Sequence, residues 1–195
     1  MWNNCSIRIV RPMYHVKNDK RALKSAEKIM EGLAICIKNK KIDNVGVTDI
    51  ALASGVSRGT FYRLFDSPVD VLAYTCNRLA EEAMKASSDA GISNWRDYTA
   101  FSLNFCMTHS NVLETLLGSG RNDIIENTLN RFYMDKGAVF NEHISNGLTG
   151  EALEYIRNSS TASICAIVFT WIKHGRKETV EELMAIHDRF FKFND

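Results

Sequence analysis

Two helix-start signals on either side of a single glycine constrain this chain more than any other feature. Residues 47–72 read VTDIALASGVSRGTFYRLFDSPVDVL. Thr48 is a good N-cap residue, and Gly55 suits the left-handed backbone conformation that ends a helix after about two turns. Ser57 is a second N-cap, so a second short helix is expected over residues 58–65. Two short helices joined by so tight a turn predict a helix-turn-helix.

A third helix start follows directly. Ser67 is placed as an N-cap, Pro68 occupies the first helical position, and Asp70 stands where a capping-box acid would lie. The second short helix is therefore enclosed by helices on both sides, and the side chains left at its exposed edge are polar or small. These residues are Ser57, Arg58, Gly59, Thr60, Tyr62 and Arg63.

Such an edge suits a helix that lies with its N-terminus in the major groove of DNA. Arg58 could then read a guanine edge, and Thr60 could meet a thymine methyl group. Tyr62 and Arg63 could hold phosphates. The alternative is a tight turn between two core helices, which gives little packing reason for an exposed Gly59–Thr60 pair.

Several short motifs closely resemble the DNA-binding segment of the tetracycline-repressor (TetR) family. They are Thr48-Asp49-Ile50-Ala51, Ser54-Gly55-Val56-Ser57, Gly59-Thr60-Phe61-Tyr62 and Phe65-Asp66-Ser67. The resemblance covers about 50 residues and implies an all-helical dimer. Its N-terminal part would be a three-helix DNA-binding unit and its C-terminal part a bundle that binds small ligands.

The resemblance also implies further DNA contacts. In the family the start of the first helix lies against the DNA backbone, so we expect Lys20 and Arg21 to contribute to binding. We also expect a DNA contact from Thr48, at the start of the second helix. The chain departs from the family at Pro68, where family members usually have a Lys that contacts a DNA phosphate. Proline has no ammonium group and no N–H, so this phosphate contact is not expected to carry over.

Basic charge is concentrated near the helix-turn-helix. The whole chain carries a formal net charge of only +1 at pH 7. Residues 1–66 hold 12 Lys and Arg against 6 Asp and Glu, whereas residues 67–195 hold 12 against 17. This asymmetry is expected when only one end of a protein meets a polyanion.

The sequence lacks the patterns of several other functional classes. Nothing resembles a catalytic triad, a phosphate-binding loop or a dinucleotide fingerprint. The five histidines form no metal-binding pair, and the five cysteines form no CxxC pair, so we expect reduced thiols and no metal site. No signal peptide and no apolar run of roughly 18–20 residues is present. We therefore expect a cytoplasmic protein with no enzymatic activity, cofactor or membrane association.

Helical periodicity suggests how the chain is divided. Residues 1–17 are expected to form a flexible arm, residues 18–66 the DNA-binding domain, and residues 67–195 a connecting helix with a ligand-binding and dimerisation domain. About nine helices and no strand are expected. The expected helices cover residues 19–37, 48–54, 58–65, 67–87, 95–108, 111–117, 123–145, 150–174 and 178–193.

Aromatic residues mark a candidate effector pocket in the C-terminal part. Apolar walls with a few polar tips describe a ligand pocket, but they equally describe a packed helical core. The family resemblance favours a pocket, and its apolar walls favour a hydrophobic or amphipathic effector. The candidate residues are Phe101, Phe105, His109, Tyr133, Phe140 and Phe169.

The last two helices carry apolar faces that are too wide for a single buried side. Pairing with the same helices of a second copy would form a four-helix dimer interface, as the family resemblance also implies, while internal packing is the alternative. The candidate interface residues are Phe169, Trp171, Ile172, Leu183, Ile186 and Phe190.

Together these features predict a dimeric, ligand-responsive regulator of transcription, most simply a repressor of a palindromic operator. Its expected partners are double-stranded DNA, a second copy of the chain and a small hydrophobic or amphipathic effector. One alternative is a regulator that binds DNA constitutively, without an effector. Another is a helical enzyme or small-molecule carrier with a vestigial helix-turn-helix, against which the absence of any catalytic constellation argues.

Overall fold

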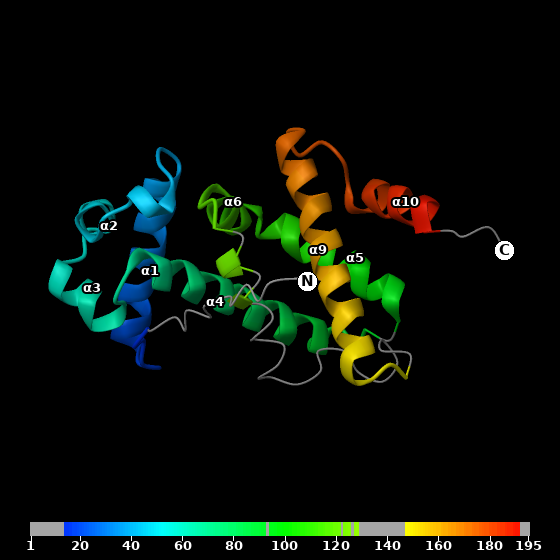
Figure 1. The fold of residues 1–195 in the computed structure, drawn as a ribbon, viewed down its shortest axis with the longest axis horizontal. Coiled ribbons are helices and arrows are strands. Elements are labelled where there is room, and N and C mark those ends of the chain that lie inside the picture. The colour runs from blue at the N-terminus through cyan, green and yellow to red at the C-terminus, as the bar shows by residue number, and fades with distance from the viewer. Residues whose placement is uncertain (1–13, 93, 122, 126, 129–146, 192–195) are drawn as a thin grey trace, which may run out of the picture. The chain divides into compact units, whose positions relative to one another are not determined.

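The fold is almost entirely helical, as the sequence predicts. The structure is a computed structural model that describes residues 14–92, 94–121, 123–125, 127–128 and 147–191. Within these ranges there is no strand beyond an isolated bridge between Tyr14 and Phe65. The helices are α1 (Lys20–Ile37), η1 (Ile42–Asn44), α2 (Val47–Ser54), α3 (Arg58–Leu64), α4 (Pro68–Asp89), α5 (Trp95–Thr108), α6 (Ser110–Gly118), α9 (Gly150–Lys173) and α10 (Val180–Phe191), drawn in Figure 1.

The chain divides into two compact units. Unit 1 comprises residues 1–78 and 115–131, and unit 2 comprises residues 79–114 and 132–195. Helices α4 and α6 each contribute residues to both units. The boundary that the sequence suggests near residue 66 remains a prediction.

Unit 1 is built around α1, α2, α3 and the first turns of α4, coloured blue to cyan-green in Figure 1. Helix α1 buries Ile29 and Leu33 completely, and α2 and α3 add Ile50 and Phe61 to the same fully buried set. Gly32 lets α1 approach α2 closely, because a Cβ atom at this position would lie 2.8 Å from the Cβ of Ser54. The three helices therefore share one core, and α3 is fixed on it.

Helix ends in unit 1 follow local capping signals, with one exception. Ser57 caps α3 through the N–H of Thr60 at 3.1 Å, and Gly55 adopts a φ of +66° after α2, as predicted. The prediction that Thr48 caps α2 was wrong, since the helix begins at Val47. The reason is that the Asp49 carboxylate accepts the backbone N–H of Gly46 at 2.8 Å, so that Gly46 becomes the N-cap and the helix begins one residue earlier than predicted.

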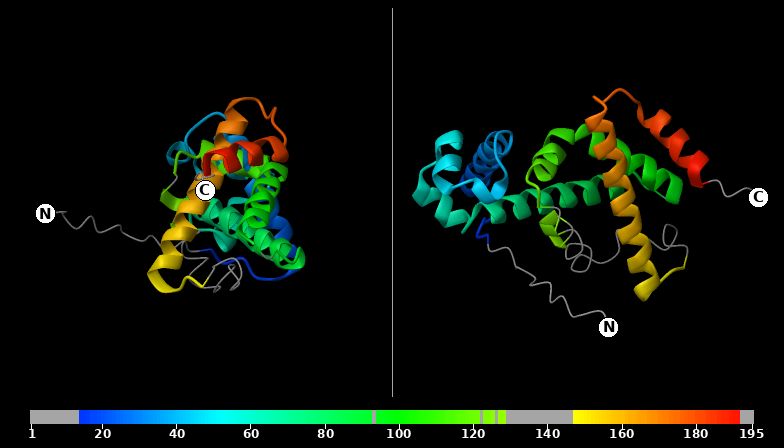
Figure 2. Two further views of the ribbon diagram at one scale, coloured as in Figure 1. Left: turned by 90° about the vertical axis from the view of Figure 1, so that its right-hand side faces the viewer. Right: turned by 45° about the horizontal axis from the view of Figure 1, so that its top comes forward.

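Unit 2 contains α5, α9 and α10, and α5 contacts both of the other helices. The views in Figure 2 show these three helices together. The predicted capping box at the start of the last helix is confirmed, because Thr179 and Glu182 each accept the other's backbone N–H, at 3.3 and 2.8 Å. The helix predicted over residues 123–145 lies mostly outside the described residues.

Two general features concern the described residues only. No helix among them is both long and apolar enough to cross a membrane. Four of the five cysteines lie among them, and all four are free thiols. Burial raises the pKa of Cys106 on α5 to about 12, and burial also raises the pKa of Cys165 on α9. Such thiols are poor nucleophiles at neutral pH.

Candidate nucleic-acid interface

Helix α3 presents a polar edge on an apolar base. Phe61 is 0% exposed and Leu64 is 2% exposed, so one face of this seven-residue helix is anchored in the core of unit 1. On the outer side Tyr62 is 49% exposed. Of the residues predicted to bind DNA from this stretch, Thr60 is half-buried and the others are exposed: Ser57, Arg58, Gly59, Tyr62 and Arg63.

The cations that are predicted to contact DNA are not engaged by carboxylates among the described residues. Arg58 and Arg63 on α3, and Lys20 and Arg21 at the start of α1, are all exposed. None of these four forms an ion pair with another of the described residues. By contrast, Lys40 donates a hydrogen bond to Asp49 at 2.7 Å. The four unpaired side chains can therefore approach an anionic partner without first breaking an ion pair.

Ser57 and Thr60 form a small polar pair at the start of α3. The Ser57 hydroxyl donates to Oγ1 of Thr60 at 3.0 Å and accepts the Thr60 N–H. Ser57 is thus occupied with capping, whereas Thr60 keeps its own hydroxyl proton and methyl group for other contacts. Gly59 stands between them, and a Cβ atom added there would meet nothing closer than 4.0 Å. No neighbour among the described residues therefore requires a glycine at this exposed position.

Thr48 and Asp49 lie at the start of α2. Thr48 is exposed, as a DNA contact requires. The hydrogen bond from Lys40 is the main cause that lowers the pKa of Asp49, and the N–H of Gly46 lowers it further. The carboxylate is therefore ionised at neutral pH and holds Lys40 away from other anions.

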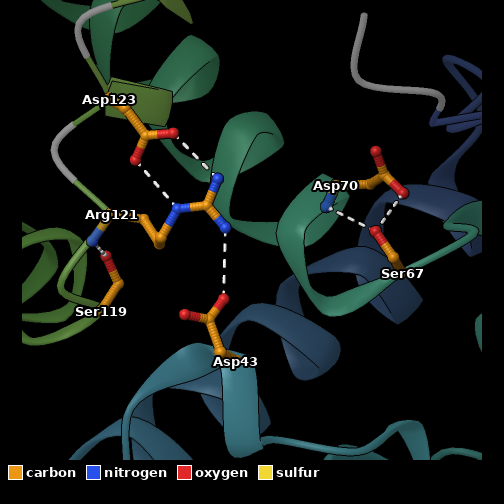
Figure 3. A network of polar contacts seen from close by, with 6 residues as sticks. All are labelled: Asp43, Ser67, Asp70, Ser119, Arg121 and Asp123. Atoms are coloured by element: carbon orange, nitrogen blue, oxygen red, sulfur yellow. Dashed lines mark hydrogen bonds and ion pairs between the residues drawn. The ribbon is translucent and has the colours of Figure 1, made fainter. Parts of the chain in front are cut away.

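The start of α4 is occupied by its own side chains, as Figure 3 shows. The Ser67 hydroxyl donates to Oδ2 of Asp70 at 2.6 Å and accepts the Asp70 N–H at 3.3 Å, so the predicted N-cap is confirmed. Pro68 adds no N–H. A capped helix start with a carboxylate in its first turn does not favour a phosphate, which fits the departure from the family pattern at Pro68.

A second polar network in unit 1 centres on Arg121, also drawn in Figure 3. Its guanidinium binds both carboxylate oxygens of Asp123, at 2.9 and 2.8 Å, and one oxygen of Asp43 at 3.2 Å. The hydrogen bond to Asp123 is the main cause that raises the pKa of Arg121 and lowers that of Asp123. The chain after α6 is thereby linked to η1, and the N–H of Ile42 also points to the Ser119 carbonyl at 3.5 Å.

Sequence reasoning did not find this network. Arg121 and Asp43 are 78 positions apart, and neither belongs to a motif. The contact of Tyr14 with Asn77, 63 positions away, also differs from the prediction, since a flexible arm over residues 1–17 makes no such bond. No local signal in the sequence marks either pair.

In unit 2 the predicted effector residues of α5 form one stack. The rings of Phe101 and Phe105 are 6.1 Å apart, and the ring of His109 lies 4.1 Å from that of Phe105. Nδ1 of His109 donates to the Phe105 carbonyl at 2.8 Å, and Nε2 lies 3.2 Å from Glu82. Phe169 on α9 is half-buried. Tyr133 and Phe140 lie outside the described residues.

The predicted dimer residues divide into two kinds. Trp171 and Leu183 are each 8% exposed, and the indole N–H of Trp171 donates to the Glu178 carbonyl at 2.9 Å, so both pack within a single chain. Phe169 and Ile172 are half-buried, whereas Ile186 on α10 is 63% exposed. The side chain of Phe190 lies outside the described residues. The dimer itself remains a prediction.

No site for a metal ion is formed by the described residues, since they contain no group of three or more His, Cys, Asp or Glu side chains in suitable positions.

Comparison with solved structures shows a shared fold. A Listeria innocua protein, Lin0861, has a TM-score of 0.73 at 15% identity, over 96% of this chain and 98% of the other. FadR from Bacillus halodurans, described as a fatty acid degradation regulator, has a TM-score of 0.56 at 14% identity, over 87% and 96%. The transcriptional regulator FadR from Bacillus subtilis, solved with stearoyl-CoA, has a TM-score of 0.51 at 16% identity, over 84% and 94%.

Sequence comparison adds the family. No curated protein matches the chain. Residues 93–192, just over half of the chain, match the TetR_C_8 family model, described as "Transcriptional regulator C-terminal region". The remaining half contains the helix-turn-helix and its exposed α3. The chain belongs to the TetR family of transcriptional regulators.

Proposed function

We propose that this regulator is a cytoplasmic repressor without catalytic activity that binds a palindromic operator as a homodimer, with α3 in the major groove. One observation carries the DNA contact: α3 turns Phe61 and Leu64 into the core and leaves Arg58 and Arg63 exposed and without ion pairs among the described residues. A helix anchored in this way holds base-reading side chains rigidly. Lys20 and Arg21 add cationic contacts to the DNA backbone.

Selection of bound DNA from a random pool tests this proposal. The expected product has two inverted half-sites whose centres are about 10 base pairs, or a multiple of that, apart. Arg58→Ala should then relax the preference at one position of each half-site by roughly 1–3 kcal/mol. Lys177→Ala, an exposed change in unit 2, is the control and should leave the selected sequence unchanged. No enrichment of any sequence by the wild type would contradict the proposal.

The effector that we propose is an amphipathic molecule with a long acyl chain. The stack of Phe101, Phe105 and His109 places apolar rings next to one polar group, the His109 imidazole. Two proteins with the same fold are described as FadR, and one of them was solved with stearoyl-CoA. An acyl chain against the rings and a charged head near His109 would match this distribution of polarity.

Two routes for effector control follow from the chain itself. Both α4 and α6 have residues in unit 1 and in unit 2, so a shift of either helix in unit 2 is passed to unit 1 along the helix. Arg121 lies just after α6. Its hydrogen bond to Asp43 connects this part of the chain to η1, the short helix that precedes α2. The ion pair is partly exposed and worth little on its own, so it sets position more than stability.

Effector control has a definite energetic requirement. To move the dimer from almost entirely DNA-competent to almost entirely incompetent, the effector must prefer the second state by about 10⁴-fold, or roughly 5.5 kcal/mol. Stearoyl-CoA should therefore release operator DNA and raise the melting temperature of the wild type, whereas CoA alone should do neither. Phe105→Ala should weaken both effects. If stearoyl-CoA binds without changing operator affinity, the regulator acts constitutively instead.

A further inference from the structure

Residues 14–16 lie against the end of the recognition helix, and we call them the N-terminal strap. The backbone N–H of His15 donates to the Leu64 carbonyl at 2.8 Å, and Tyr14 forms an antiparallel bridge with Phe65. Leu64 is the last residue of α3, and its carbonyl has no partner within the helix. The strap therefore supplies a hydrogen bond that α3 cannot make for itself.

The side chain of Tyr14 extends the same contact to α4. Its hydroxyl accepts a hydrogen bond from Nδ2 of Asn77 at 2.6 Å, and its ring meets the ring of Tyr74 edge-on at 5.1 Å. Tyr74 and Asn77 are three positions apart and so lie on one face of α4. The ring of Tyr74 also lies 5.5 Å from that of Phe65. One residue of the strap thus contacts both sides of the corner between α3 and α4.

This corner is short. Only residues 65–67 separate α3 from α4, and Phe65 is in an extended conformation with a φ of −144°. Helix α3 has only seven residues, and Phe61 and Leu64 are its two buried side chains, so contacts at the corner add to a small set of anchors. The angle between α3 and α4 depends on what spans the corner, and the strap spans it from the backbone of Leu64 to the side chain of Asn77.

We propose that Tyr14 is a positioning residue for DNA recognition, which sets the angle of α3 through its hydrogen bond to Asn77. The inference rests on the proposed binding of DNA through α3. Base contacts need α3 at one angle in the groove, whereas phosphate contacts by flexible Lys and Arg side chains tolerate small rotations. Loss of the Tyr14–Asn77 bond therefore reduces affinity for the operator more than affinity for unrelated DNA.

The test uses the full-length chain and three variants: Tyr14→Phe, Asn77→Ala and the double variant. Tyr14→Phe removes only the hydroxyl and keeps the ring against Tyr74. Each variant should weaken binding to the selected operator by about fivefold, the value of one hydrogen bond, and the double variant by no more than either single one. Affinity for unrelated DNA should change by less than about twofold. Tyr155→Phe, at an exposed tyrosine of unit 2, is the matched control and should change neither.

A purely structural role for the strap predicts different results. It would lower the melting temperature and reduce affinity for both DNAs by the same factor, or leave both affinities unchanged, and either result overturns the proposal. Additive losses in the double variant would also overturn it, since the two groups would then act separately.

A measurement without DNA separates this inference from the proposed function. Tyr14→Phe should speed hydrogen exchange at the Phe65 amide, which bonds to the Phe61 carbonyl at 2.8 Å, while amides in the middle of α1 exchange as in the wild type. If exchange is faster but no operator is ever selected, the proposed function fails and the strap still holds the corner. Unchanged exchange at Phe65 means that the strap does not hold it.

Discussion

Units 1 and 2 differ in the side chains that they expose. Unit 1 exposes cations that have no ion pair among the described residues, among them Arg58 and Arg63 on the short helix α3, which Ser57 caps. In unit 2 the last two described helices expose large apolar side chains, with Ile186 at 63% and Ile156 at 41%. Unit 1 also exposes single apolar residues, such as Leu52 at 86%, which need no special explanation. The difference fits the proposed roles, in which unit 1 binds DNA and unit 2 pairs with a second copy of the chain.

The largest expected effect is on the stability of unit 1. Phe61→Ala empties a fully buried position in the aromatic cluster with Phe65, and it should cost about 3–5 kcal/mol. Circular dichroism should show unit 1 unfolding at lower urea. In a Trp2→Phe background the remaining tryptophans, Trp95 and Trp171, both belong to unit 2, so their fluorescence should change at the original urea concentration.

Leu52→Ala is the control for this experiment, because an exposed change should alter stability by less than about 0.5 kcal/mol. If Phe61→Ala moves the tryptophan transition as far as the helical one, the two units unfold together, and the comparison between them fails.

A second prediction concerns the apolar surface of unit 2. Ile186→Glu should give folded monomers, since this side chain is 63% exposed in the single chain. Loss of the second half-site contact should reduce operator affinity by at least about a hundredfold. Light scattering measures the mass, and Lys177→Glu, at an exposed position of unit 2 outside α9 and α10, is the control. A wild type that is already monomeric at micromolar concentration would contradict the dimer.

Leu183 is a poor probe for the same question. It is only 8% exposed, so a charge there would disturb the core of unit 2 itself, and loss of the dimer could not be separated from loss of the fold.

Substitutions at two glycines of unit 1 distinguish an effect on helix packing from an effect on DNA recognition. Gly32→Ala should cost about 1–3 kcal/mol of stability, because its new Cβ atom would lie 2.8 Å from that of Ser54. Gly59→Ala meets no such neighbour and should stabilise α3 by up to about 1 kcal/mol, since alanine favours a helix. If α3 approaches DNA closely at Gly59, this stabilised variant binds the operator more weakly. Thermal unfolding and anisotropy titrations measure the two effects.

Local interactions in unit 1 were the predictable ones. Ser57, Ser67 and Gly55 act on backbone groups within three positions, so their roles can be read from neighbouring residues. The start of α2 was misplaced by one residue because two signals compete there, and the Asp49 carboxylate reaches back to Gly46. Helix boundaries depend on such short-range competition.

Contacts across long stretches of sequence could not be predicted. The Arg121–Asp43 pair and the Tyr14–Asn77 bond depend on how the helices pack, which no periodicity specifies. The same holds for the dimer residues: an apolar stripe includes both Leu183 and Ile186, and only the packed structure shows that one is buried and the other exposed.

The smallest expected effect is a pH dependence at Asp49. The hydrogen bond from Lys40 lowers the pKa of Asp49 in the folded protein. The stabilisation from this carboxylate is therefore complete above the pKa of an aspartate in the unfolded chain, near 4, and is lost as the pH falls through the lower folded pKa. Asp49→Asn should therefore flatten the loss of stability of unit 1 below about pH 4. Leu52→Ala, an exposed change on α2 that removes no titratable group, is the control and should keep the acid dependence of the wild type. Identical acid transitions for wild type and Asp49→Asn would show that the pair is not maintained in solution.

The operator affinity of the double variant Arg58→Ala/Tyr62→Ala tests most directly whether α3 of unit 1 recognises the DNA. Both side chains are exposed on α3, so the double variant should keep the melting temperature and mass of the wild type. If α3 is the recognition helix, anisotropy titration with the selected operator should show a loss of at least about a hundredfold, because each copy loses a base contact and a phosphate contact. Binding equal to that of the wild type would mean that DNA is recognised elsewhere.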